Sequence, residues 1–107
     1  MEQSNLTDHV RFEDGEAARS PIFESERLFS QLLCLSRNQS FGPVGDPEAD
    51  AMLTVLAGEA AFQVGKRRTR LKQWGSVLVA AGDDVTVKNA SAEPLVVLMV
   101  TAPPPTG

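Results

Sequence analysis

The sequence predicts an all-β domain built from short strands, arranged as a sandwich or barrel. Short stretches rich in Val, Leu, Phe and Thr alternate with Gly, Pro, Asn and Asp at close intervals, and this spacing is typical of such folds. No window carries apolar residues at i, i+3, i+4 and i+7 between capping residues, so helical signal is poor. The 107-residue length and 42% apolar content fit one domain with a packed core.

The strands are expected where β-forming residues run between turn residues, at 9–13, 22–24, 27–36, 50–56, 59–64, 67–71, 75–80, 85–89 and 95–101. Residues 59–64 are expected to follow 50–56 as its hairpin partner. Residues 43–50 are expected to form one long irregular loop, because two prolines and a glycine there disfavour strand pairing.

Three segments are expected along the chain. Residues 1–21 form an N-terminal arm with a short strand, residues 22–102 form the β-domain, and residues 103–107 form a Pro-rich tail. The prolines of this tail cannot join a strand ladder, so we expect the tail to lie outside the sheets.

Charge and composition argue against several classes of partner. The net charge of −4 disfavours a protein built to hold nucleic acid or an anionic membrane. The basic run at 66–72 has no interleaved aromatic residues, so we interpret it as a charged hairpin at a sheet edge. The longest apolar run, 95–100, is far shorter than the roughly 20 residues that cross a bilayer. With one cysteine and no leader-like N-terminus, a cytoplasmic location is expected.

Two glycine-bounded blocks recur in register. One covers residues 38–58 and ends at Gly58, and the other covers 75–89 and contains Gly75, Gly82 and Asn89. In this framework residues 22–104 resemble the small single-domain cupins of the RmlC-like, cupin_2 type. The resemblance implies a jelly-roll β-barrel, also called a double-stranded β-helix, with a pocket inside. It also implies a homodimer, because cupins are similar to one another in forming dimers.

The resemblance stops at the metal ligands. Metal-dependent cupins are similar in using three histidines and a carboxylate, and the matching positions here hold Val44, Asp46, Ala51 and Val85. Three of these four side chains cannot donate an electron pair, whereas a transition-metal site needs donors converging on one point. The single histidine, His9, lies in the arm. We therefore expect no metal and no cofactor.

The register places a set of pocket candidates inside the barrel, namely Gln31, Val44, Asp46, Ala51, Leu53 and Val85. Two outcomes are open. The barrel is filled by side chains, or it encloses an apolar cavity for a small ligand.

Other conspicuous residues are expected in structural roles. Asp83 and Asp84 fit turn chemistry, Cys34 a buried thiol, and Asn89 a hydrogen bond between strands. Trp74 fits the pocket rim, an interface or the cover of a barrel end.

Three functions compete. The first is a non-catalytic, metal-free cupin that binds a small, largely apolar molecule or a protein partner. The second is a metal-independent isomerase, lyase or cyclase that uses Asp46 with polar groups such as Gln31; the alternative for Asp46 is a solvated loop carboxylate or a turn cap. The third is a structural dimerisation module with a filled barrel. The loss of ligands with retention of the framework glycines favours the first.

Overall fold

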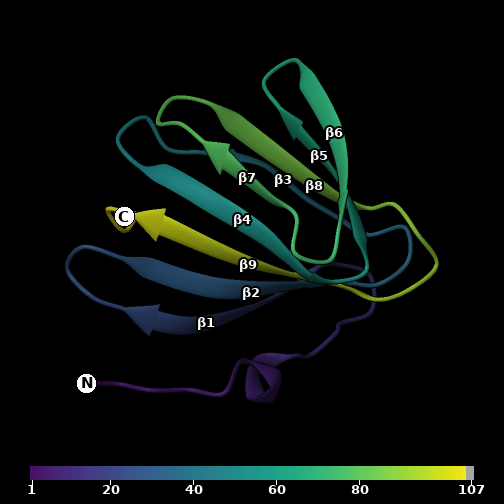
Figure 1. Cartoon of the computed structure of the whole chain (residues 1–107), viewed down its shortest axis with the longest axis horizontal. Coiled ribbons are helices and arrows are strands. Elements are labelled where there is room, and N and C mark those ends of the chain that lie inside the picture. The colour runs from purple at the N-terminus through teal and green to yellow at the C-terminus, as the bar shows by residue number, and fades with distance from the viewer. Residues whose placement is uncertain (106–107) are drawn as a thin grey trace.

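Two antiparallel β-sheets packed face to face make up the molecule (Figure 1). The computed structural model describes residues 1–105. A short 3₁₀ helix, Leu6–His9, precedes nine strands: β1 (Ala18–Glu24), β2 (Phe29–Leu35), β3 (Ser40–Gly45), β4 (Asp50–Ala57), β5 (Glu59–Val64), β6 (Arg67–Lys72), β7 (Ser76–Val79), β8 (Asp84–Asn89) and β9 (Leu95–Ala102). The predicted all-β class is confirmed. Within these residues no helix has the length and apolarity needed to cross a bilayer.

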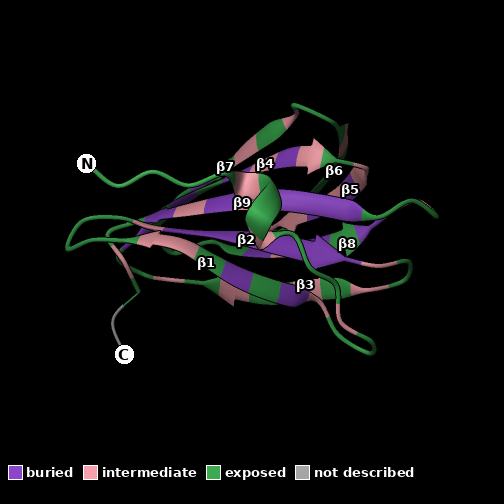
Figure 2. Cartoon of the chain, turned by 90° about the horizontal axis from the view of Figure 1, so that it is seen from below, coloured by how far each residue is buried: buried purple, intermediate pink, exposed green. Residues whose placement is uncertain are grey.

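The core lies between the two sheets. The first sheet has the order β1-β2-β9-β4-β7, and the second has the order β3-β8-β5-β6. Because side chains alternate across a strand, every second residue points inward, and Figure 2 shows the buried residues concentrated on strands such as β2 and β9. The largest fully buried side chains of this core are Phe62, Leu33, Leu35, Leu53 and Leu95.

The predicted hairpin between 50–56 and 59–64 is wrong. These segments form β4 and β5, which belong to different sheets; β4 pairs with β7 and β9, and β5 pairs with β6 and β8. Gly58 separates them with φ +87°, and a Cβ there would lie 2.5 Å from the Pro94 carbonyl oxygen. The glycine allows the chain to pass close to Pro94 and to change sheets.

The predicted irregular loop at 43–50 is wrong over its first part, because β3 extends through Gly45 and pairs with β8. Phe41 opposes Val87 and Val44 opposes Val85, and the register shifts between these two pairs. Pro43 falls within this bulge on an edge strand, so its missing N–H interrupts no regular ladder. A proline therefore did not exclude a strand here.

The N-terminal prediction also needs correction. Residues 9–13 form no strand; His9 ends the 3₁₀ helix, whose start is capped by the Asn5 side chain. The first strand begins at Ala18, inside the segment expected to be an arm, and contains Pro21 next to a bulge. At the other end, residues 103–105 lie beyond β9, and Thr106 and Gly107 of the expected tail fall outside the described residues.

Asn89 connects the two sheets at one end of the barrel. Its Nδ2 donates to the carbonyl oxygens of Leu35 in β2, at 3.0 Å, and of Glu93, at 2.8 Å. Its Oδ1 accepts the Ser91 backbone N–H at 2.9 Å. The predicted structural hydrogen bond between strands is confirmed.

Two expectations concerned exposed residues, the basic run at 66–72 and Trp74. Strand β6, with its basic residues, is an edge strand paired with β5 in a hairpin, as predicted. Trp74 is 72% exposed and lies away from the interior. Met52 and Leu78, which oppose each other on β4 and β7, are also exposed. The expected pairing of two copies stays a prediction.

Candidate functional site

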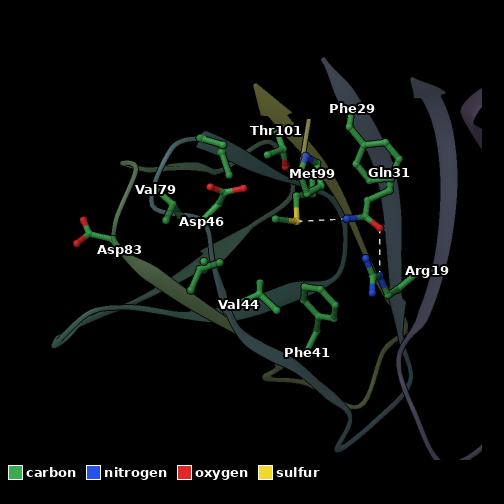
Figure 3. Close-up of a pocket in the computed structure, with 15 residues that line it drawn as sticks. Arg19, Phe29, Gln31, Phe41, Val44, Asp46, Val79, Asp83, Met99 and Thr101 are labelled. Carbon is green, nitrogen blue, oxygen red and sulfur yellow. Dashed lines mark hydrogen bonds between the residues drawn. The ribbon is translucent and has the colours of Figure 1, made fainter. Parts of the chain in front are cut away.

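A cavity of about 170 Å³ opens at one end of the space between the sheets (Figure 3). It is lined by the inward residues near the ends of strands from both sheets: Arg19, Phe29, Gln31, Phe41, Val44, Gly45, Asp46, Ala49, Ala51, Val79, Asp83, Val85, Met99, Thr101 and Pro105. The apolar core fills the rest of the interior. The barrel is thus not fully packed, and its cavity lies at the end opposite Asn89.

The four positions matched to metal ligands meet at this cavity. Val44 and Val85 oppose each other on β3 and β8, Ala51 faces them from β4, and Asp46 follows β3 directly. Their convergence supports the register of the sequence match. One carboxylate among three alkyl side chains does not fit a transition metal, and residues 1–105 contain no group of three or more His, Cys, Asp or Glu placed to hold one.

Of the two remaining pocket candidates, one lies at the cavity and the other lies deeper in the core. Gln31 lines the cavity, whereas Leu53 lies two residues further along β4 than Ala51 and is fully buried in the core. Both β4 residues point inward, so the alternation was correct. The alternation predicts the direction of Leu53 but not the depth at which the cavity ends.

Gln31 is a buried polar group at the cavity wall, with 4% of its surface exposed. Its Nε2 lies 3.7 Å from the Met99 sulfur, and its Oε1 accepts a hydrogen bond from Arg19 Nε at 3.2 Å. A thioether is a weak acceptor. The amide is therefore fixed in orientation while its nitrogen retains donor capacity toward the cavity.

Arg19 contributes a positive charge that the sequence did not reveal. It sits on β1, at the edge of one sheet, and its guanidinium carbon lies 5.3 Å from the ring centre of Phe41 on β3, at the edge of the other sheet. Such a contact with a ring face is attractive. Arg19 was missed because its segment was expected to be an arm. Met99 and Thr101 were also missed, although they continue the inward alternation of β9 from Val97.

Asp46 supplies negative charge on the other side of the cavity from Arg19, whereas the carboxylate of the exposed Asp83 points away from the cavity (Figure 3). Asp46 is half-buried, and its Oδ1 accepts the Glu48 backbone N–H at 2.8 Å, which caps the turn after β3. Asp83 follows a turn in which its own N–H donates to the Ala80 carbonyl oxygen. The cavity therefore has a cationic side, an anionic side and apolar walls between them.

Cys34 lies outside this site, on the outer face of the first sheet. It packs with Ala18, Leu32 and Val96 in a second apolar cluster, where it is fully buried as predicted. Burial raises the pKa of the Cys34 thiol above its usual value of 9.0, and Arg11 offsets part of the shift. The thiol is therefore a structural group with no place at the cavity.

The free energy of unfolding is expected to fall as the pH rises above about 9, and part of this fall is expected to come from Cys34. The unfolded chain loses the thiol proton at its ordinary pKa, whereas the folded chain retains it, so the folded state loses relative stability. Urea unfolding at pH 8 and pH 10 measures this effect. The fall should be smaller in Cys34→Ala, and an identical fall in both proteins would contradict the assignment.

Comparison with known proteins places the chain among double-stranded β-helix structures. It is similar to TT1209 from Thermus thermophilus, with 31% identity and a TM-score of 0.93 over 98% of this chain and 100% of that one. It is also similar to an uncharacterized conserved protein with a double-stranded β-helix domain from Klebsiella pneumoniae, with 24% identity and a TM-score of 0.92 over 100% and 94% of the two chains.

An RmlC-like cupin protein from Desulfovibrio desulfuricans gives 22% identity and a TM-score of 0.86 over 98% of this chain and 99% of that one. No family model and no curated protein matches the sequence. The likeness to solved structures therefore covers essentially the whole chain, including every strand that lines the cavity.

Proposed function

Because the chain belongs to the cupin family as a small single-domain member, we propose that it is a non-catalytic, metal-free binding module whose barrel holds a small, largely apolar molecule. The observation that carries this proposal is the cavity itself. It lies where the metal ligands of the family would converge, and its walls there are Val44, Ala51 and Val85. Apolar walls with a few fixed polar groups are the usual character of a small-molecule site.

The volume of the cavity limits the size of the ligand that it can hold. At about 170 Å³ it is close to an engineered apolar cavity of roughly 150 Å³ that binds benzene. The ligand therefore has an apolar body of about one six-membered ring. A barrel filled by its own side chains, as the structural-module alternative requires, would leave no such space.

The enzymatic alternative has less support. Asp46 lines the cavity, but one of its oxygens already accepts the Glu48 N–H. The chain has no tyrosine, and its one histidine lies at the end of the N-terminal 3₁₀ helix. General acid–base work commonly pairs such groups within hydrogen-bond reach, and residues 1–105 bring no second proton-transfer group of this kind to Asp46.

Toluene is expected to bind the cavity of the wild-type protein, and Ala51→Leu to weaken this binding by about tenfold. The larger side chain displaces about two carbons of the ligand, each worth about 0.8 kcal/mol of burial. Titration followed by two-dimensional NMR measures the affinity and locates the shifted residues. Ala57→Leu makes the same change at an exposed position at the end of β4 and should leave binding unchanged.

Metal analysis of the untagged protein by ICP-MS, with native mass spectrometry of the same sample, completes the test. A stoichiometric transition metal would overturn the metal-free assignment. The binding proposal would also fail if toluene shifted no cavity resonance in the wild-type protein. A retained organic molecule in the native mass spectrum would support it and supply the ligand for identification.

A further inference from the structure

Arg19 places a cation at the mouth of the cavity. Arg19 is held from two sides: its Nε donates to Gln31 Oε1 at 3.2 Å, and its guanidinium lies over the Phe41 ring, 5.3 Å from the centre. These contacts come from both sheets, since Gln31 belongs to β2 and Phe41 to β3. The guanidinium is therefore anchored at the opening, where Arg19 is also exposed to solvent.

The donors of this guanidinium are only partly used. Among residues 1–105 no acceptor is paired with the Nη atoms of Arg19, and its charge makes no salt bridge. The two salt bridges of this part of the chain involve Arg11 with Glu13, and Arg70 with Glu59. A planar guanidinium with free Nη donors matches the geometry of a carboxylate.

The wall beside Arg19 provides a second donor. The Gln31 amide nitrogen points along the cavity wall toward Met99 and has the weak thioether as its partner. An anionic oxygen near Arg19 would be a stronger acceptor for this N–H than sulfur is. Because Gln31 is 4% exposed, it is already desolvated and oriented before a ligand enters.

The opposite side of the cavity restricts the charge of the ligand. Asp46 lies there (Figure 3), and like charges at close range repel. A ligand with negative groups at both ends would place one of them against Asp46. A single negative group directed toward Arg19 avoids this repulsion.

We propose that the cavity recognises a small apolar monocarboxylate, with its carboxylate bound by Arg19 and Gln31 and its apolar body against Val44, Ala51 and Val85. This inference rests on the proposed function and adds the chemical class of the ligand. The volume of the cavity limits the apolar body to about one ring. Benzoate is therefore a suitable probe, and benzamide is its uncharged counterpart of nearly the same shape.

The test is a double-mutant cycle between the probe and the protein. Wild-type protein is expected to bind benzoate at least about tenfold more tightly than benzamide, in the range found for hydrogen bonds to charged groups. In Arg19→Gln this preference should disappear, while affinity for benzamide and toluene changes little. Arg19→Lys should retain part of the preference, because it keeps the charge and loses the planar fork.

Arg37→Gln serves as the matched control. It removes the same charge from an exposed turn between β2 and β3 and leaves the cavity untouched. It should bind benzoate like the wild-type protein. Thermal unfolding of each variant without ligand confirms that the fold is retained.

The outcomes separate this inference from the proposed function. Toluene binding with equal affinity for benzoate and benzamide would overturn the carboxylate inference and leave the apolar site standing. A benzoate preference that persists in Arg19→Gln, or is lost equally in Arg37→Gln, would overturn the role of Arg19. Absence of binding by toluene, benzoate and benzamide would overturn both.

Discussion

A variant that carries the ligand set of the metal-dependent cupins is expected to bind a transition metal, and we expect the wild-type chain to bind none. The four substitutions are Val44→His, Asp46→His, Ala51→Glu and Val85→His. The four positions line one cavity, and Val44 and Val85 are cross-strand neighbours. Three imidazoles and a carboxylate converging on one point suit Zn²⁺ or Ni²⁺. We expect about one equivalent of metal, with a Kd of roughly micromolar or tighter.

Isothermal titration and ICP-MS after dialysis measure the metal affinity and content. Val85 is 1% exposed, so a histidine there costs stability in the metal-free variant, and added metal should raise its Tm by mass action. The matched control omits Val85→His and should bind much more weakly. If the complete variant folds and binds no metal, the register between sequence and motif is wrong.

Replacing Phe62 with alanine is expected to lower the free energy of unfolding by about 3–5 kcal/mol. Phe62 lies on β5, is 1% exposed, and faces the other sheet from the middle of the core. Its removal leaves a void that the surrounding strands fill only partly. The loss is a large part of the stability of a domain of this size, typically about 5–15 kcal/mol.

Urea unfolding monitored by circular dichroism measures this change. Leu78→Ala provides the comparison, because Leu78 is 72% exposed on β7 and such surface substitutions usually change stability by less than about 0.5 kcal/mol. A loss below about 1 kcal/mol in Phe62→Ala would contradict the assignment of Phe62 to the packed core.

Much of the barrel could be predicted because its strands carry clear signals. Segments β4 to β9 lie between turn residues, several of them glycines, and their predicted bounds lie within one residue of the observed ones. Strands β1 and β3 lacked this signal, since each contains a proline, Pro21 or Pro43. Both are edge strands with a bulge at the proline, a tertiary circumstance that local sequence does not report.

The site was predictable to the extent that it depended on motif spacing. Spacing brought Val44, Asp46, Ala51 and Val85 to one place, and the structure locates all four at the cavity. Arg19 carries no such spacing. Its position depends on contacts with Gln31 and Phe41 from two sheets, and these contacts exist only after the sheets have packed.

Gly42 has a consequence for any attempt to change what the barrel accepts. Its φ is +103°, and a Cβ at this position would lie 2.5 Å from the Val85 carbonyl oxygen, so a side chain there would push β3 away from β8. The backbone at Gly42 therefore has little freedom to vary, and the side chains around the cavity are the positions to change. A library for altered selectivity should randomise Val44, Ala51 and Arg19 and keep Gly42 constant.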